Sequence, residues 1–344
     1  MEAVFFMSLR KNDNCKLISR LTPGRLFNML SLRLSFTWSQ LIRKAVHAGM
    51  PGSLSIEPTT SCNLRCPGCH CGTGSFTRPR GKMDMALFRK IIDDAGPKLF
   101  YLLLYFQGEP FLHPELSEMI SIAVSRRIYT ATSTNGHFLD EKNTEMIIRS
   151  GLNRLIISVD GSTQESYEKY RVNGKLDKVI EGTALLKEAR VKAGTKKPFI
   201  VWQFLVLRHN EHQIAEVRQM AEKAGVDRFE VKSAQLSPFE NGNELMPENP
   251  KFSRYLQQYD GTYRIKNRLK NKCKRMWCSA VVTWDCKMVP CCFDKDAEYI
   301  LGDLSSVSLK EVWKSDQYRQ FRQRILDERK NITICNNCTE GLKI

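Results

Sequence analysis

From residue 53 to about residue 233, strand-like and helical hydrophobic patterns alternate along the chain. Six short apolar runs predict strands over Leu54–Glu57, Phe100–Phe106, Ile128–Ser133, Arg154–Val159, Phe199–Leu207 and Phe229–Lys232. Apolar residues at three- and four-residue spacing predict helices over Met85–Ala95, Pro114–Ser125, Glu141–Ser150, Leu176–Lys192 and Glu211–Ala224. This alternation predicts an α/β fold with a parallel sheet, doubly wound or a partial (β/α)6 barrel, whose ligands bind at the carboxyl ends of the strands.

The segments on either side of this region differ from it. Residues 1–50 carry eight Lys and Arg but two acids, and helical apolar spacing over Arg25–Val46 predicts an amphipathic helix. That helix either packs on the main domain or lies on an anionic surface such as a membrane. We expect a basic helical extension at 1–50, a main domain at 51–240, a polar linker at 241–272 and a Cys-rich domain at 273–344, which includes helical spacing over Leu309–Leu326.

Charge and cysteine content narrow the class of protein. The 344 residues carry a formal net charge of +16 and twelve Cys, of which four lie between Cys62 and Cys71 and seven between Cys273 and Cys338. The apolar stretch Ala3–Met7 is followed, not preceded, by basic residues, which does not fit a signal peptide. We therefore expect a cytoplasmic protein whose clustered thiols, apart from the isolated Cys15, bind metal rather than form disulfides.

The first cysteine group directly follows the first predicted strand. Cys62, Cys66 and Cys69 have CxxxCxxC spacing, which is one thiolate short of a closed tetrahedral site. Three thiolates favour an iron–sulfur cluster with one iron open to a small ligand. Zinc completed by His70 or Cys71, or a redox thiol pair, are the alternatives.

Here the chain resembles the radical S-adenosylmethionine (SAM) enzymes, in which CxxxCxxC holds a [4Fe–4S] cluster that binds SAM. Gln107-Gly108-Glu109-Pro110 resembles the family's Gly-Gly-Glu-Pro element, and Glu109 suits the SAM amino group because an ammonium needs an acceptor. Ser133 to Gly136 and Ser158 to Gly161 resemble strand ends near the SAM ribose, and Arg171 resembles an Arg that pairs with the SAM carboxylate. The resemblance implies a SAM site formed by Gln107, Gly108, Glu109, Ser133, Asn135, Ser158, Asp160 and Arg171.

Two positions depart from the family pattern. Gly68 stands before the third Cys, where the family usually has an aromatic residue, so adenine stacking has to come from elsewhere. Gln107 replaces the first Gly of Gly-Gly-Glu-Pro. Cys71 is an extra thiol, which we interpret as a spare buried side chain rather than an alternative ligand.

The second cysteine group resembles the SPASM or twitch extension that follows many radical SAM barrels. The resemblance implies an auxiliary [4Fe–4S] cluster held by Cys273, Cys291, Cys335 and Cys338; spacing alone would leave zinc as a rival. Cys286 stands where the hairpin Gly of the pattern belongs, and Cys does not take positive φ cheaply, so either the turn differs or Cys286 is a ligand. Cys278 and Cys292 are further rivals.

The resemblance implies reductive cleavage of SAM to a 5′-deoxyadenosyl radical that abstracts hydrogen from a C–H bond. The auxiliary cluster would accept the substrate electron, and the substrate would be a small molecule or a peptide or protein. The basic charge favours docking of an acidic flavodoxin or ferredoxin as electron donor. The sequence assigns no catalytic side chain. The alternative is a non-catalytic metal-binding scaffold with nucleic acid as its candidate ligand, although no aromatic–basic RNA-binding motif is present.

Overall fold

The computed structural model describes residue 13 and residues 17–340, which fall into two compact units. Unit 1 contains the described residues up to Thr60, then Thr77–Ala131, and those from Asn267 onward. Unit 2 contains Ser61–Phe76 and Thr132–Lys266. The units cut across the expected domain boundaries, because the first and last parts of the chain share unit 1. The Ala3–Met7 stretch and Cys15 lie outside the described residues.

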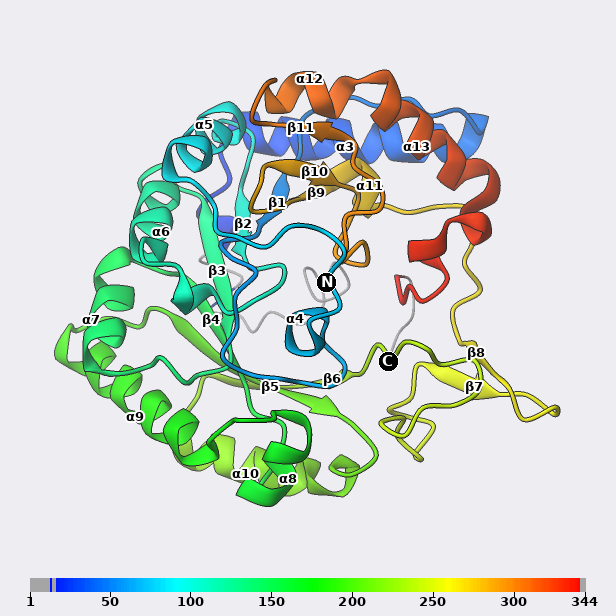
Figure 1. Ribbon diagram of the computed structural model, residues 1–344. Helices are drawn as coiled ribbons and strands as arrows, with labels where there is room; N and C mark the ends of the chain where they lie inside the picture. The colour runs from blue at the N-terminus through cyan, green and yellow to red at the C-terminus, as the bar shows by residue number, and fades with distance from the viewer. Residues whose placement is uncertain (1–12, 14–16, 341–344) are drawn as a thin grey trace. The chain divides into compact units, whose positions relative to one another are not determined.

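Unit 1 is built on a sheet in which strand β1 is central (Figure 1). Strand β1 (Ser53–Ile56) pairs in parallel with β2 (Tyr101–Leu104) on one side and with β9 (Ser279–Val282) on the other. Strands β10 (Lys287–Val289) and β11 (Gly302–Asp303) continue the sheet in antiparallel order. The Cys-rich C-terminal region therefore extends the sheet of the first predicted strands instead of folding apart from it.

Several helices of unit 1 begin at a capping side chain. The helices of this unit are α3 (Pro23–Ile42), α5 (Met85–Ala95), α6 (Leu116–Ser125), α11 (Arg275–Cys278), α12 (Leu309–Lys314) and α13 (Asp316–Glu328), with short 3-10 turns at Pro110–Leu112, Arg329–Asn331 and Thr333–Cys335. Helices α6 and α11 have no capping side chain. The Asp84 side chain caps α5 by accepting from the amides of Ala86 and Leu87. Ser315 is extended, ends α12 and caps α13, so the single helix predicted over Leu309–Leu326 is two helices.

Unit 2 continues the strand–helix alternation. Its parallel strands are β4 (Arg154–Ser158), β5 (Phe199–Val206) and β6 (Arg228–Ser233), and the unit boundary divides β3 (Tyr129–Thr134). Its helices are α4 (His70–Thr73), α7 (Glu141–Ser150), α8 (Gln164–Tyr170), α9 (Leu176–Lys192) and α10 (Ile214–Ala224), with a 3-10 turn at Glu211–Gln213. Phe204 and Phe229 pack toward α10, where Arg218 covers the Phe229 ring. The opposite face of β5 and β6 carries Gln203 and Lys232, which leaves polar groups on the face without that helix.

The expected α/β fold with a parallel sheet is confirmed, and the bounds of α5, α7 and α9 match the predicted helices. The segment expected as a linker contains an antiparallel pair that polar composition does not predict, β7 (Tyr255–Gln257) and β8 (Tyr263–Ile265). Tyr255 anchors it, because its ring stacks on Phe239 at 4.6 Å and its hydroxyl bonds the Leu236 backbone. Among the described residues, no helix has the length and apolarity that crossing a bilayer requires.

Candidate cofactor sites

The three cysteines of the CxxxCxxC motif lie on one loop of unit 2, residues 61–76, here called the Cys loop. Its turn is closed by the Cys69 amide, which donates to the Cys66 carbonyl at 3.1 Å. A Cβ on Gly72 would lie 2.5 Å from the Cys66 backbone nitrogen, so the loop requires glycine there. Leu64 and Cys66 are buried among Tyr170, Leu207 and neighbouring apolar side chains, which anchors the loop to the unit.

Cys62 sits among groups that stabilise its thiolate. The Leu64 amide donates to its Sγ at 3.4 Å, and the Asn135 side-chain amide lies 3.9 Å from the same atom. The pKa of Cys62 is lowered to about 6, chiefly by a hydrogen bond with Cys71, against the opposing effect of burial. Asn135 also donates to Asn63 at 2.7 Å, so this expected SAM contact lies beside the Cys loop. Cys71 therefore contacts Cys62 and is not simply a spare thiol.

Arg171 connects the Cys loop to the end of β4. Its Nε pairs with Asp160 Oδ2 at 2.6 Å, and its NH1 lies 3.8 Å from the Sγ of Cys66. Asp160 is fully buried and is held by the Leu205 amide at 2.7 Å. Burial raises the pKa of Cys66 to about 11, while Arg171 acts in the opposite direction. In this arrangement Arg171 stands beside Cys66, and Asp160 orients its guanidinium.

An aromatic ring lies where Gly68 leaves space on the Cys loop. A Cβ on Gly68 would be 3.1 Å from the hydroxyl oxygen of Tyr170. Tyr170 closes α8 and is buried, and the Arg171 guanidinium carbon lies 5.4 Å from its ring centre. The ring beside this part of the loop thus comes from α8, a helix that the sequence patterns did not predict.

The other expected SAM contacts lie at strand ends. Gln107, Gly108 and Glu109 belong to unit 1, just after β2; Gly108 has a φ of +72°, and Glu109 is buried. The Glu109 Oε1 accepts the Phe111 amide at 3.1 Å and so caps the turn at Pro110–Leu112. Ser133 and Ser158 are half-buried on β3 and β4 in unit 2. The structure thus brings Asn135, Asp160 and Arg171 to the Cys loop.

In unit 1, the four cysteines expected for the auxiliary cluster line a single cavity. Cys273 precedes α11 and Cys291 follows β10, while Cys335 ends the 3-10 turn at Thr333–Cys335 and Cys338 follows that turn. The rest of the wall is formed by Arg275, Met276, Pro290, Phe293, Phe321, Ile325, Arg329 and Ile334. This donor set of four thiols in an otherwise largely apolar wall fits a four-iron cluster, which takes four thiolates.

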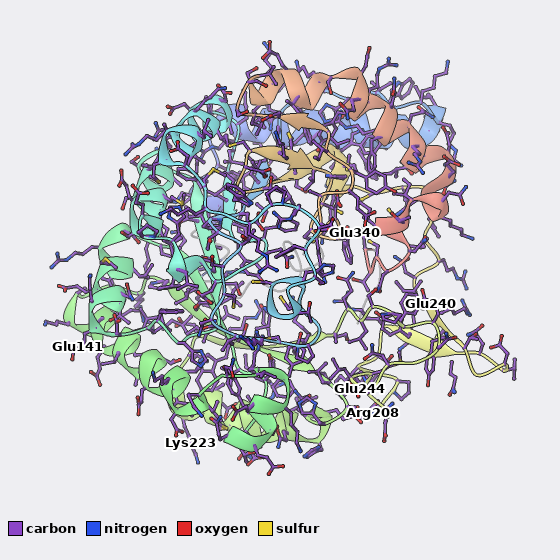
Figure 2. All side chains as sticks on the ribbon, viewed as in Figure 1. Glu141, Arg208, Lys223, Glu240, Glu244 and Glu340 are labelled. Carbon is purple, nitrogen blue, oxygen red and sulfur yellow. The ribbon has the colours of Figure 1, made fainter. Side chains whose placement is uncertain are left out.

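Two buried arginines lie against thiols of this region. Arg329 NH2 lies 3.3 Å from the Sγ of Cys338 and Arg275 NH1 lies 3.2 Å from that of Cys292. Arg275 also pairs at 2.8 Å with Glu340, which Figure 2 labels. Burial raises the pKa of Cys273 to about 12, and Arg329 opposes that rise. Cations in these positions compensate negative charge on thiolates.

The rival cysteines occupy other positions. Cys278 ends α11, Cys292 packs against Val281 and Val289, and neither lines the cavity. Cys286 is fully buried, lies 3.9 Å from the Met83 sulfur, and does not line it either. Its φ of +65° shows that the hairpin between β9 and β10 keeps the glycine-like turn with a cysteine in it.

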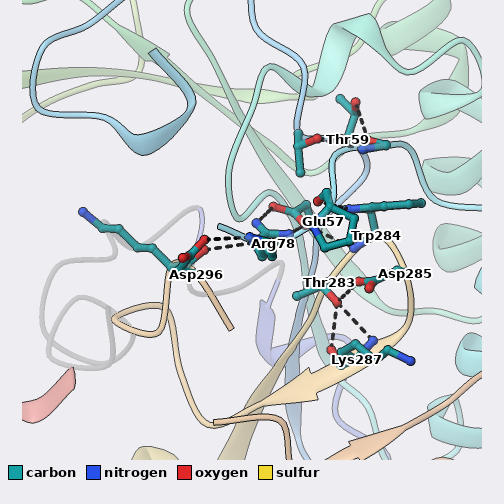
Figure 3. Close-up of polar contacts among 12 residues, drawn as sticks. Glu57, Thr59, Arg78, Thr283, Trp284, Asp285, Lys287 and Asp296 are labelled. Carbon is teal, nitrogen blue, oxygen red and sulfur yellow. Dashed lines mark hydrogen bonds and ion pairs between the residues drawn. The ribbon is translucent and has the colours of Figure 1, made fainter. Parts of the chain in front are cut away.

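Glu57, which follows β1, forms a buried ion pair with Arg78, and Arg78 also contacts the segment that carries Cys291 (Figure 3). No sequence signal predicts this pair. Arg78 donates to both carboxylate oxygens of Glu57, at 2.8 and 2.6 Å, and to the Lys295 carbonyl at 3.1 Å. Glu57 also accepts the Trp284 amide at 3.1 Å. The Asp296 carboxylate accepts the amides of Thr77 and Arg78. We call this group the Glu57–Arg78 clamp.

Comparison with known families agrees with the two cysteine groups. A model of the radical SAM superfamily matches residues 56–224, and a model of the SPASM iron–sulfur cluster-binding domain matches residues 273–339. The first range contains the Cys loop, and the second contains all four cysteines that line the cavity of unit 1.

Characterised relatives cover different shares of the chain. The tungsten-containing aldehyde ferredoxin oxidoreductase cofactor-modifying protein of Pyrococcus furiosus is 26% identical over 78% of this chain and 82% of its own length. The PqqA peptide cyclase of Gluconobacter oxydans is 29% identical over 57% of this chain and 54% of its own length. The structure of BtrN with AdoMet and 2-DOIA is 15% identical, with a TM-score of 0.53 over 86% of this chain and 94% of that chain. That last likeness concerns the fold alone.

Proposed function

Because this chain is a radical SAM enzyme with a C-terminal iron–sulfur cluster-binding domain, we propose that it is a maturase that oxidises or modifies a C–H bond of a peptide or protein. The matches to a peptide cyclase and to a cofactor-modifying protein support a maturation reaction. A small molecule is the second candidate substrate, supported by the match to a cofactor-modifying protein, since a cofactor is a small molecule. The observation that most supports an enzyme is that the side chains of Asn135 and Arg171 both approach thiols of the Cys loop.

In the proposal, Cys62, Cys66 and Cys69 hold the SAM-binding [4Fe–4S] cluster, and Cys273, Cys291, Cys335 and Cys338 hold the auxiliary one. When bound, these groups supply reductive SAM cleavage, a 5′-deoxyadenosyl radical and an acceptor for the substrate electron. Gln107, Gly108, Glu109, Ser133, Asn135, Ser158, Asp160 and Arg171 are the proposed SAM contacts. No side chain is assigned a catalytic role in hydrogen transfer from the substrate.

The chain's own polar groups have defined tasks in this proposal. Asn135 directs an N–H toward Cys62 and Arg171 directs one toward Cys66, which favours the thiolate forms that bind iron. Asp160 acts through Arg171, because the ion pair between them fixes the guanidinium beside Cys66. Arg329 plays the corresponding part for Cys338.

SAM cleavage tests the main proposal. Anaerobic protein with reconstituted clusters, SAM and dithionite should release 5′-deoxyadenosine, and a Cys62→Ala/Cys66→Ala/Cys69→Ala variant should release none. Ser75→Ala is the matched control on the same loop, because Ser75 is exposed there, and it should retain cleavage. A colourless zinc protein indifferent to SAM would instead establish the non-catalytic scaffold, and undiminished cleavage by the triple variant would refute the cluster assignment.

Iron content tests the auxiliary ligands independently of activity. Wild-type protein should hold about eight irons and a Cys335→Ala/Cys338→Ala variant about four, because each [4Fe–4S] cluster contains four irons. That variant should still cleave SAM. Cys278→Ala, Cys286→Ala and Cys292→Ala are the controls and should keep the full complement. Full iron in the double variant would mean that there is no second cluster at these cysteines.

For electron delivery we propose an acidic flavodoxin or ferredoxin in the cytoplasm, supported by the net charge of +16. Activity with flavodoxin should fall steeply with salt, since exposed charges are screened beyond about 8 Å at physiological ionic strength. Activity with dithionite should fall far less. Equal salt sensitivity with both reductants would argue against docking of an acidic donor.

A further inference from the structure

Helix α3 turns an apolar face toward solvent. Its outward positions are spaced three or four residues apart and are 51–73% exposed: Phe27, Leu30, Leu34, Trp38 and Leu41. We call these five residues the apolar stripe. Monomeric proteins scatter exposed apolar residues singly, whereas a continuous stripe marks an interaction surface. Figure 1 shows α3 as one long, uninterrupted helix.

The direction of this face is set by polar groups on the opposite side of α3. Asn28 exchanges two hydrogen bonds with the Met50 backbone, at 2.9 and 2.8 Å, and the Ser39 hydroxyl donates to the Val46 carbonyl at 2.7 Å. Arg25 is buried and donates to the carbonyls of Gly96 and Arg127. Rolling the helix to bury the stripe would break these bonds and leave buried carbonyls unsatisfied. The exposed stripe is therefore part of the folded state.

Positive charge lies at one border and at the end of the stripe, and the segment that carries it has no acidic residue. The sequence has no Asp or Glu between Asp13 and Glu57. Arg33 lies at the border of the stripe, while Arg43 and Lys44 follow its end, and all three are exposed. None of the three forms an ion pair with another residue in the part of the chain that the structure describes. These cations are available to an external anionic surface.

We propose that α3 binds in plane to the surface of a membrane that contains anionic phospholipids. Apolar residues on one face with cations at its border and end are the features of helices that lie at the lipid–water interface. Trp38 suits the headgroup region, and Arg33, Arg43 and Lys44 suit acidic headgroups. A second copy is a poorer occupant, because antiparallel pairing of two stripes would bring together the Arg33 side chains near the middle of both helices.

Vesicle sedimentation with the full-length holoenzyme tests this proposal. The protein should sediment with vesicles of equal parts phosphatidylcholine and phosphatidylglycerol, and much less with phosphatidylcholine alone. Leu34→Gln/Leu41→Gln should weaken binding by about tenfold or more, since each leucine loses apolar burial. Arg33→Glu/Lys44→Glu should weaken binding to the anionic vesicles specifically. Val191→Gln is the matched control, because Val191 is 79% exposed and belongs to α9 of the other unit, and it should leave binding unchanged.

Trp38 provides a second readout that does not depend on sedimentation. Vesicles should shift its fluorescence to the blue, and the shift should vanish in Trp38→Phe. Circular dichroism and iron content should be the same in all variants, which separates loss of binding from loss of folding. The proposal is overturned if the wild type ignores anionic vesicles, or if the leucine variant binds as the wild type does. It is also overturned if the stripe instead forms the interface of a dimer that Leu41→Gln dissociates. The same conclusion follows if segment 1–12 shields Trp38 from a soluble quencher in the absence of vesicles.

Discussion

The Glu57–Arg78 clamp allows a sharp test of how unit 1 is held together. We consider Arg78→Met, which keeps the apolar length of the side chain but removes its charge. Glu57 is fully buried and the Arg78 side chain is 7% exposed, so the variant leaves a buried carboxylate without its cation. Removing one partner of a buried pair costs about 3–5 kcal/mol, because the remaining charge is desolvated and uncompensated.

Amide hydrogen exchange under anaerobic conditions measures this loss without removing the clusters. The Trp284 amide donates to Glu57, and the Arg78 amide donates to Asp296, so residues 77–82 and 283–287 report on local opening. A loss of 3–5 kcal/mol corresponds to exchange that is faster by about a hundredfold to several thousandfold. Burial already raises the pKa of Glu57 above its usual value, so lowering the pH should partly restore protection in Arg78→Met.

Two further variants make this prediction refutable. Arg89→Met removes an exposed pair with Glu118, whose side chains are 49% and 48% exposed, and should cost less than about 1 kcal/mol. Glu57→Gln/Arg78→Met removes both charges and should recover most of the protection, since it leaves no unpaired ion. The reasoning fails if Arg78→Met opens no more than Arg89→Met, or if the double variant is as open as the single one.

Two other predictions concern unit 1. The pKa of His47 is lowered to about 3, first by burial and then by Arg322, so the folded state resists protonation of this side chain. The stability that neutral His47 contributes is therefore complete above about pH 6.5 and is lost as the pH falls toward 3. The loss is at most about 1.4 kcal/mol per pH unit. Thermal melts of wild type and His47→Gln between pH 7 and 5 should show a shallower decline in the variant, and parallel declines would contradict this. Cys286 has a φ of +65°, so Cys286→Gly should be more stable than Cys286→Ala by about 1–2 kcal/mol, the reverse of the usual order of glycine and alanine. Chemical unfolding of both variants at equal iron content measures the difference, and alanine as the more stable variant would exclude backbone strain at this turn.

Much of the fold follows from local patterns, and the exceptions have local causes. Helices α5, α7 and α9 match the predicted bounds because each repeats apolar residues at helical spacing. The predicted Leu309–Leu326 helix contains Ser315, whose side chain accepts the Tyr318 amide and so starts a new helix. Helix α8 has only seven residues, too few for a periodic pattern to emerge.

The candidate sites were also predictable from the sequence only in part. Cysteine spacing and family resemblance led to the four thiols that line the cavity of unit 1, and the exclusion of Cys278 and Cys292 from its wall required coordinates. Glu57 and Arg78 are 21 residues apart and joined through the Cys loop, so no periodicity relates them. Tyr170 beside Gly68 was likewise unpredictable, because the contact joins two segments of unit 2 that are far apart in sequence.

Helix α3 shows why periodicity cannot give the direction of an amphipathic face. The pattern measures the contrast between two sides of a helix, and the usual assumption that the apolar side faces inward rests on the free energy of burial. In α3 the inward side is chosen by Asn28, Ser39 and Arg25, which satisfy backbone carbonyls that would otherwise be buried without partners. An unsatisfied buried polar group costs about 1–3 kcal/mol, similar to the gain from burying one large apolar side chain. Several such bonds can therefore hold the apolar stripe in water, provided that the exposed face has another surface to cover it.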